Sequence, residues 1–268
     1  MSEKNHMPIR EFSRLTGIKP ANLRFYDQIG LLSPETRGEN GYRYYSRRQL
    51  NSAYLISDLR ELGVGLEEIN RYAADRSPEK MLALFSKQDE RIQKEIERLR
   101  EIRHILKLHA DMAHDALRHG ESALLLEERE REALFLCPPI PAGMDEEEGS
   151  IFSYAYAGRH GIHLGYPLGA IVRQDDFTAG CTFPASRFYF KTHRRRNAWK
   201  PAGLYAVAYA RCDVPPSEEV YHRLLHYIRE QNLRPCGDVY EEYPLDEMAV
   251  QDTDRFGIRL EVPVQRVT

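Results

Sequence analysis

The feature that most constrains the fold is a long stretch without a helix-breaking residue. From Glu79 to about His119 the sequence contains neither glycine nor proline. Apolar residues recur there at steps of three and four among charged residues, which is typical of a coiled-coil helix. A helix of roughly 40 residues extends about 60 Å, far beyond a small domain. The apolar seam consists of Phe85, Ile92, Ile96, Leu99, Ile102, Leu106 and Ala113.

A helix of this length needs another surface along its seam. The simplest partner is a second copy of the chain, and the alternative is the chain's own C-terminal half. Histidines also occur in this segment at steps of five, which distribute side chains around a helix and do not bring them together. We therefore expect no metal site there. The histidines are His104, His109, His114 and His119.

The N-terminal segment has the pattern of two short helices around a turn. Ile9 and Phe12 lie on one helical face, and Gly17 then breaks the helix because glycine has free access to positive φ. Pro20 occupies the first turn of a second helix that runs to about Ile29, where its missing N–H costs nothing. Two short helices around a glycine-bearing turn predict a helix-turn-helix.

A hairpin follows the second helix directly. Asn40-Gly41 precedes a tyrosine-rich segment, and this dipeptide between strand-forming residues is a strong signal for a tight hairpin turn. A hairpin after a helix-turn-helix is a wing. Two further helices are expected, at 47–62 and from 66 to about 74, separated by glycines.

The overall charge does not indicate a nucleic-acid-binding protein. The net charge is -3, so any DNA surface must come from local asymmetry. Residues 1–60 provide this asymmetry because basic residues outnumber acidic ones there. They include Arg10, Arg14, Lys19, Arg24, Arg37, Arg43, Arg47, Arg48 and Arg60.

Length and cysteine usage limit the class of protein. A chain of 268 residues is expected to form two domains. The four cysteines lie far apart and form no close ligand pair, so we expect neither disulfides nor a metal site. No apolar run approaches the ~20 residues that a membrane-spanning helix needs. We therefore expect a soluble, cytoplasmic protein. The cysteines are Cys137, Cys181, Cys212 and Cys236.

The pattern changes to short strands after Gly120. The expected order is strand, helix and two strands, followed by the same order again, which predicts an internal duplication of a small α+β unit. The expected strands are 133–137, 168–172, 187–192, 204–211, 238–243 and 255–263, and the expected helices are 145–159 and 217–231.

Several short motifs occur in order within the first 75 residues. They are Leu23-Arg24-Phe25-Tyr26, Gly30-Leu31-Leu32, Pro34, Arg37, Gly41-Tyr42-Arg43, Tyr45, Leu62-Gly63-Val64 and Leu66-Glu67-Glu68-Ile69. In this order and spacing they resemble the DNA-binding domain of the MerR family of transcription regulators. That family pattern implies an antiparallel coiled coil for the long helix.

Further motifs occur in the C-terminal half. They are Gly161-Ile162 before Tyr166-Pro167-Leu168-Gly169, Ala202-Gly203-Leu204-Tyr205-Ala206, and Gly237-Asp238-Val239-Tyr240-Glu241-Glu242-Tyr243. This half is similar to the GyrI-like effector domain of the BmrR-type, multidrug-binding MerR branch. The fold class expected is therefore multidomain α and α+β. It combines a winged helix-turn-helix at 1–76, a dimerisation coiled coil at 77–119 and a duplicated β-α-β-β effector domain at 120–268.

DNA binding requires cations and hydrogen-bond donors that face phosphate, together with a helix that can enter the major groove. For the aromatic pair on the second helix, we expect Phe25 in the core and Tyr26 on the DNA. The expected DNA-binding residues are Lys19, Asn22, Arg24, Tyr26, Arg37, Tyr42, Arg43, Tyr45 and Arg60.

The C-terminal half is rich in aromatic rings, which suit a flat cationic or aromatic ligand near a buried carboxylate. The BmrR-type pattern places an acid in the strand after the second helix, and Glu241 matches it. Strand alternation separates Glu241 from Glu242, so one of the two is expected to point inward. Arg259 occupies a place where such domains often carry an acid. The expected ligand-binding residues are Glu241, Tyr243, Tyr154, Tyr156, Phe188, Phe190 and Tyr209.

The resemblance implies a homodimeric activator that binds a palindrome in promoter DNA and distorts it for RNA polymerase. It would sense a small, aromatic, drug-like molecule that can be cationic. We expect no enzymatic activity, no cofactor and no membrane partner. Two alternatives remain: a GyrI-like small-molecule hydrolase fused to a DNA-binding head, in which a glutamate and a tyrosine would do the chemistry, and an architectural DNA-binding dimer without a ligand.

Overall fold

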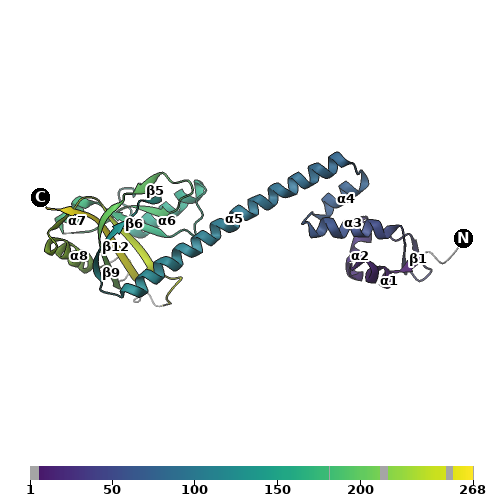
Figure 1. Ribbon diagram of the computed structural model, residues 1–268, viewed down its shortest axis with the longest axis horizontal. Helices are drawn as coiled ribbons and strands as arrows, with labels where there is room; N and C mark the ends of the chain where they lie inside the picture. Colours follow the sequence, from purple (N-terminus) through teal and green to yellow (C-terminus); the bar gives the residue numbers. More distant parts are fainter. Residues whose placement is uncertain (1–5, 181, 212–216, 252–255, 268) are drawn as a thin grey trace. The chain divides into compact units, whose positions relative to one another are not determined.

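The computed structural model describes residues 6–180, 182–211, 217–251 and 256–267 (Figure 1). Cys181, Cys212 and the expected strand start at Arg255 lie outside the described residues. The chain divides into two compact units, Met1–Leu99 and Arg100–Thr268. The long helix α5 (Pro78–His119) belongs partly to each unit. A single helix over this range agrees with the absence of glycine and proline.

The first unit contains the expected helices and hairpin. Its elements are β1 (His6–Pro8), α1 (Ile9–Thr16), α2 (Pro20–Gln28), β2 (Thr36–Arg37), β3 (Arg43–Ser46), α3 (Gln49–Glu61) and α4 (Leu66–Ala74). The strands form a small sheet in the order β1-β3-β2. Gly17 ends α1 at φ 73°, a conformation that glycine adopts without strain.

One apolar core holds this unit together. Phe12 of α1, Leu23 of α2 and Ile56 of α3 are fully or almost fully buried in it. Ile69 of α4 and Leu84 of α5 join the same core. The helices and the hairpin are therefore packed as one body, which fixes α2 relative to the wing.

The second unit is a large antiparallel sheet with helices. Its strands are β4 (Leu124–Arg129), β5 (Glu132–Pro139), β6 (Leu168–Val172), β7 (Ala185–Lys191), β8 (Ala198–Lys200), β9 (Gly203–Arg211), β10 (Leu233–Pro235), β11 (Val239–Leu245) and β12 (Gly257–Arg266). Its further helices are α6 (Glu146–Arg159), α7 (Gln174–Ala179) and α8 (Glu218–Glu230). The strand order is β4-β9-β12-β11-β6-β7-β5-β8, with β10 paired to β12.

The order strand, helix, strand, strand occurs twice in this unit. The first series is β5-α6-β6-β7 and the second is β9-α8-β11-β12, with the short α7 inserted after β6. Each series forms three neighbouring strands, and the two series meet where β6 pairs antiparallel with β11. This junction lies in the middle of the sheet, so both series contribute to its two faces.

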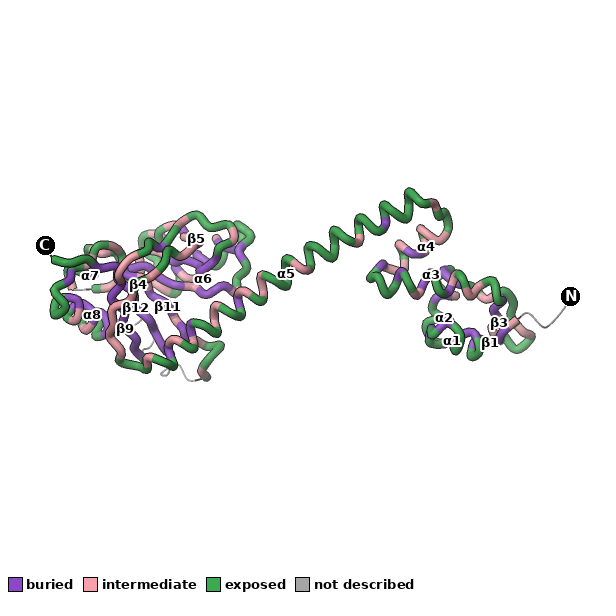
Figure 2. The backbone as a smooth tube through the Cα atoms, in the orientation of Figure 1, coloured by how far each residue is buried: buried purple, intermediate pink, exposed green. Residues whose placement is uncertain are grey.

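Helices cover the two faces of the sheet differently. Val220, Leu224 and Ile228 of α8 pack on one face, within the largest core cluster of this unit. On the opposite face, Ala116 of α5 packs with residues of β9, including Tyr205. The strands β9, β11 and β12 are buried along most of their length (Figure 2). The C-terminal part of α5 thus lies against the sheet face opposite α8.

The sheet is strongly curled. β8 stands at one end of the strand order and β12 lies near the other end, yet Lys200 of β8 forms an ion pair with Glu261 of β12. The two residues Glu130 and Arg131 connect β4 to β5 and thus join strands from opposite ends of the order. The face that carries α5 is therefore the concave one.

Several short elements were not predicted from the sequence. They are β1, β4, β8, β10 and α7. β4 has only partly buried or exposed residues, and the others are too short to show a period. No helix among the described residues is long and apolar enough to cross a membrane.

Candidate functional site

The helix α2 presents a polar surface on the first unit. Lys19, which precedes the first turn, and Asn22 and Arg24 are all exposed. In a helix-turn-helix, the second helix is the element that enters the major groove. Exposed cations and an amide on this helix can contact phosphate oxygens and base edges.

The prediction for the two aromatic residues of α2 was wrong about their faces. Phe25 is 47% exposed, whereas Tyr26 is 7% exposed and lies in the core beside Leu23. Residues three apart share a helical face, so the face that buries Leu23 also buries Tyr26. Phe25, two positions after Leu23, points away from that face and shares the exposed surface with Arg24.

The wing is tied to α2 through Asp27. Arg43 donates from Nε to Asp27 Oδ2 across 2.6 Å, and Arg37 donates from Nη2 to the same oxygen at the same distance. Burial alone would raise the pKa of Asp27, but the hydrogen bonds from the two arginines outweigh it and lower the pKa. Both predicted wing arginines therefore come together at the end of α2.

The tyrosines of the wing have different positions. Tyr42 is exposed at the hairpin, as a DNA-facing residue requires. Tyr45 is fully buried, stacks on Phe12 with 4.4 Å between ring centroids, and donates its hydroxyl to Leu23 O at 3.5 Å. The structure therefore places Tyr45 in the core and not on the proposed DNA surface, because its ring completes the packing under α1.

Arg60 lies at the end of α3. It is exposed and donates from Nη1 to Val64 O at 3.0 Å. This hydrogen bond closes the turn between α3 and α4 and leaves the rest of the guanidinium available to a phosphate. The surface of the first unit thus combines Arg24 and its neighbours on α2, the hairpin and Arg60.

In the second unit, β11 carries two buried carboxylates on opposite faces. Glu241 is 1% exposed and lies on the face covered by α8. It accepts hydrogen bonds from the hydroxyls of Tyr221 on α8 and of Tyr243, the latter at 3.1 Å. Burial raises its pKa to about 7. The expectation that one acid points inward is too simple, since Glu242 is fully buried on the other face.

Glu242 is the centre of a buried ionic cluster on the concave face. Lys191 donates to Glu242 Oε1 at 2.9 Å, Arg259 binds Oε2, and Lys200 Nζ lies 3.8 Å from Oε1. Burial would raise the pKa of Glu242, but these cations outweigh it and hold the pKa low. Arg259 and Lys200 also pair with Glu261. The cluster is therefore nearly neutral, and Glu242 at its centre is paired with cations on both of its oxygens.

Lys200 has an unusual environment for a lysine. Its Nζ lies 4.8 Å from the ring centroid of Tyr240 and 5.3 Å from that of Tyr205, distances typical of cation–π contacts. Burial lowers the pKa of Lys200 to about 8, although Glu242 opposes this shift. The lysine thus fills the concave face between the two tyrosines.

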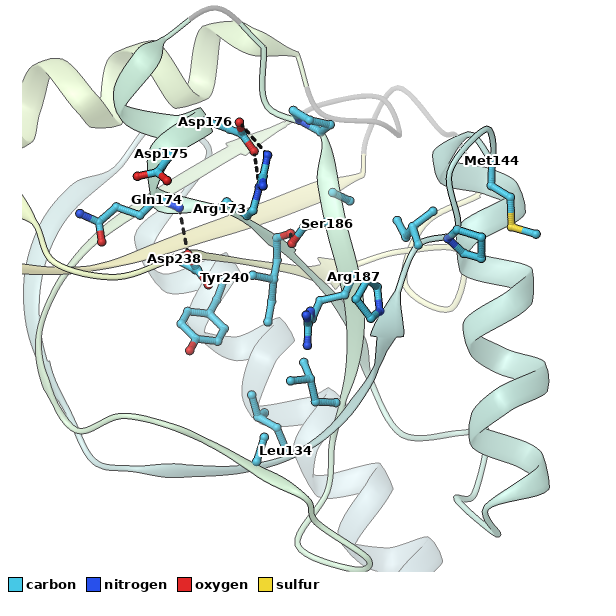
Figure 3. Close-up of a pocket in the computed structure, with 18 of the residues that line it drawn as sticks. Leu134, Met144, Arg173, Gln174, Asp175, Asp176, Ser186, Arg187, Asp238 and Tyr240 are labelled. Carbon is cyan, nitrogen blue, oxygen red and sulfur yellow. Dashed lines mark hydrogen bonds and ion pairs between the residues drawn. The ribbon is translucent and has the colours of Figure 1, made fainter.

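Two hollows open on the concave side of the sheet, and Trp199 lines both. The sheet hollow has a volume of about 950 Å³ and is lined by strand residues that include Leu134, Ile171 and Tyr240. Figure 3 shows Tyr240, Arg187 and Leu134 around it, with Asp175, Asp176 and Asp238 at one end and Met144 at the other.

The helix hollow has a volume of about 550 Å³ and lies against α5. One wall is formed by α5, including His104, Asp111 and Asp115. The opposite side is formed by the ionic cluster, including Lys200 and Arg259. A molecule in this hollow would therefore touch both the sheet and α5.

The seven expected ligand residues do not come together in either hollow. None of them lines the described parts of the sheet hollow or the helix hollow. Glu241 and Tyr243 lie under α8, and Phe188, Phe190 and Tyr209 are core residues. Tyr154 makes an edge contact with Phe190 at 5.4 Å, and Tyr156 packs beside Phe135.

The sequence-based prediction missed Trp199, Tyr240 and Lys200 as lining or neighbouring residues of the hollows. A usable signal was present, because Trp199 is the single tryptophan of the chain and stands between basic residues. It is exposed, with Arg131 4.6 Å and Arg196 5.0 Å from its ring centroid. Both guanidinium groups are within cation–π distance of this exposed ring.

The helix-turn-helix and wing, with basic residues on their exposed side, define a DNA-binding protein. Comparison with known proteins agrees. A family model described as the MerR HTH family regulatory protein matches residues 7–75. The chain is 30% identical to the multidrug-efflux transporter 2 regulator of Bacillus subtilis, and the alignment covers 100% of both. The chain belongs to the MerR family and is a DNA-binding transcription regulator.

Two further similarities concern a second regulator and a solved fragment. The chain is 26% identical to the transcriptional regulator BrlR of Pseudomonas aeruginosa, over 88% of this chain and 92% of that protein. Its sequence is 28% identical to that of the chain in the crystal structure of the N-terminus of MtaN, the Bacillus subtilis multidrug transporter activator. That similarity covers 38% of this chain and 94% of the fragment, with a TM-score of 0.35.

Proposed function

We propose that the chain is a homodimeric, ligand-responsive transcription activator of the BmrR type, working in the cytoplasm on promoter DNA. The proposal divides the chain into a DNA-binding domain at 1–76, a dimerisation helix at 77–119 and a GyrI-like effector domain at 120–268. The strand-helix-strand-strand order that occurs twice in the last segment supports the GyrI-like assignment.

Dimerisation through an antiparallel coiled coil of α5 is supported by an exposed apolar seam. Ile92, Leu99 and Leu106 follow each other at heptad spacing on α5 and are 46%, 52% and 60% exposed. Large apolar side chains repeated along one stripe of a long helix are stabilised when a second helix covers them. The single chain leaves this stripe open, and a second copy supplies the same stripe.

The two DNA-binding domains of such a dimer, held at a fixed separation, would bind a palindromic operator. The basic surface around Arg24 and the wing would hold phosphates, and deformation of the DNA costing a few kcal/mol would be offset by these contacts. Distortion would bring the two promoter elements into phase for RNA polymerase. An effector would favour one of two dimer geometries and thus shift their populations.

The sheet hollow is the proposed effector site, in place of the residues expected around Glu241. It combines the rings of Trp199 and Tyr240 and the apolar residue Ile171 with carboxylates at one end, Asp175 and Asp238. Rings and apolar side chains suit a flat aromatic molecule, and the carboxylates suit a positive charge on it. The regulator of B. subtilis that resembles the chain over its full length is named for multidrug efflux, which agrees with such a ligand.

The hydrolase alternative receives little support from the geometry. A general base must reach the substrate, whereas Glu241 is buried under α8 and its oxygens are occupied by Tyr221 and Tyr243. Neither hollow includes Glu241 among its described lining residues. We therefore assign Glu241 a place in the packing of α8 on the sheet.

The proposal is tested by transcription in vitro from a promoter that the protein selects from its own genome. Tetraphenylphosphonium, an aromatic cation, serves as the effector probe. We expect it to increase transcript from the wild-type protein, and Tyr240→Leu to weaken this response while DNA binding is kept. Tyr227→Leu on α8, away from the hollow, is the matched control. Equal responses in both variants would remove the sheet hollow from the proposal.

A further inference from the structure

We infer that the helix hollow is a second binding site, which takes an aromatic carboxylate. The carboxylate group of this ligand replaces the side chain of Asp115 as the partner of Arg259. Among the described lining residues, this site shares only Trp199 with the proposed effector site in the sheet hollow. Its chemistry is also the opposite, because it recognises a negative charge.

The deepest charged groups of the helix hollow are mostly cations. Four buried charged residues line it: Lys191, Lys200, Arg259 and Glu261. Glu242, the carboxylate that joins the three cations, is not among the lining residues and lies behind them. A ligand entering from the α5 side therefore meets the cationic side of the cluster first.

Two guanidinium groups of the hollow are incompletely satisfied. Among the residues that the structure describes, the buried Nε atoms of Arg129 and Arg259 have no hydrogen-bond acceptor. Arg259 Nε lies 3.2 Å from Glu261 Oε1, an ion-pair distance without hydrogen-bond geometry. Buried donors without an acceptor are rare and costly, so an additional carboxylate near them would be stabilising.

The outer side of Arg259 is held by a weak internal partner. Asp115 of α5 accepts from Arg259 Nη1 at 3.4 Å, and its side chain is 44% exposed. Ion pairs at this distance and exposure contribute little to stability because solvent screens them. A carboxylate ligand can therefore take the place of the Asp115 carboxylate on Arg259.

Of the other carboxylates on the walls, Glu261 pairs with Arg259, whereas Asp111 and Glu132 are each held by a lysine. Asp111 is paired with Lys107 at 2.7 Å and Glu132 with Lys191 at 2.9 Å. Trp199 lies at the rim, with the guanidinium of Arg131 over its ring. A ring attached to the ligand carboxylate would pack against this pair of guanidinium and indole, and this sets an aromatic acid apart from a simple anion.

Asp115 and Asp111 provide a matched pair of variants. They are one helical turn apart on α5 and both line the hollow, but only Asp115 contacts Arg259. Asp115→Asn removes the internal competitor, so we expect the affinity for benzoate to rise about fivefold. This factor corresponds to the free energy that a partly exposed ion pair contributes. Asp111→Asn removes the same charge from the same hollow and is expected to change the affinity less than twofold.

The measurement is a benzoate titration of the full chain by calorimetry, with the fluorescence of Trp199, its single tryptophan, as a second signal. Benzamide tests the need for charge and acetate the need for the ring. We expect benzoate to bind more tightly than both, and Asp175→Asn, a change in the sheet hollow alone, to leave its affinity unchanged. This last result separates the site from the proposed effector site. Absence of benzoate binding, equal binding of benzamide, or equal gains in the two aspartate variants would overturn the inference.

Discussion

Arg43 of the wing donates a hydrogen bond from Nε to Asp27 Oδ2 at the end of α2, across 2.6 Å. The side chain of Asp27 is almost fully buried, and Arg37 donates a hydrogen bond to the same oxygen. The pair therefore connects the two parts of the proposed DNA surface, the recognition helix and the hairpin. Contact with DNA needs both parts at a fixed spacing, and this pair is a direct link between them.

Asp27→Asn should weaken DNA binding more than it weakens the fold. The amide cannot hold two guanidinium groups as a carboxylate does, so the hairpin loses its anchor on α2. We expect about a tenfold loss in operator affinity, corresponding to ~1.4 kcal/mol. The measurement is a titration of labelled operator DNA at constant salt, because phosphate contacts depend on ionic strength.

The pH dependence of the same link has a definite sign. The pKa of Asp27 is lowered in the folded chain, so its stabilising effect is present above the ordinary carboxyl pKa and is lost as the pH falls through the folded value. The wild-type first unit should lose stability in acid more steeply than Asp27→Asn does. Parallel acid transitions of the two proteins would contradict the role given to Asp27.

The two faces of α2 should respond differently to alanine. Tyr26→Ala empties part of the core and should lower the free energy of unfolding by about 3 kcal/mol. Phe25→Ala on the exposed side should change it by less than about 0.5 kcal/mol. Urea unfolding followed by circular dichroism measures both. A Phe25 variant as unstable as the Tyr26 variant would show that the faces are assigned incorrectly.

Arg24→Ala should weaken operator binding without a change in unfolding or in the number of subunits. Arg24 is exposed on α2, and the structure gives no role to its side chain in the core. Loss of one phosphate or base contact by arginine costs about 1–3 kcal/mol. An operator affinity equal to that of the wild type would remove Arg24 from the DNA surface.

The apolar seam of α5 predicts the oligomeric state of its variants. Leu99→Glu places a charge within the proposed helix–helix contact and should produce monomers at micromolar concentration. Gln93→Glu adds the same charge on an exposed position outside the seam and should leave the dimer intact. Sedimentation velocity distinguishes the two states. Dimers of equal stability in both variants would exclude this seam as the interface.

Glu241 should make the second unit less stable as the pH rises. Its pKa is raised by burial to about 7, from 4.5, so the folded chain retains a proton that the unfolded chain releases between these values. Stability should therefore fall from pH 4.5 to 7, by about 3 kcal/mol, and level off above. Glu241→Gln should lack this decline.

The fluorescence of Trp199 follows unfolding of the second unit in this comparison, because it is the single tryptophan and lies in that unit. Glu147→Gln, an exposed change on α6, is the control and should keep the wild-type profile. A decline retained in Glu241→Gln would mean that another group causes it.

Local patterns in the sequence were sufficient for all helices but the short α7 and for the strand-helix-strand-strand order. Gly17 and Pro20 correctly separate α1 from α2, and the segment from Glu79 to His119 forms a single helix as its lack of breakers indicates. These features depend on residues close together in the chain. Secondary structure with strong periodicity is for this reason the most predictable level.

The details of the sites depend on residues far apart in the chain and could not be predicted. The exposure of Phe25 is fixed by how α2 packs in its unit, and Glu242 is buried because Lys191, Lys200 and Arg259 come from three other strands. The alternation in β11 correctly separated Glu241 from Glu242. It could not show that each face offers its own partners to a carboxylate.

The central claim is that two copies of this chain bind DNA through paired surfaces around Arg24. The most direct test is nuclease footprinting on a genomic fragment that the protein retains. We expect two protected half-sites related by a two-fold axis, with altered cleavage at the centre where the DNA is distorted, and loss of both half-sites in Arg24→Ala. A single protected half-site, or an unchanged footprint in Arg24→Ala, would contradict the account.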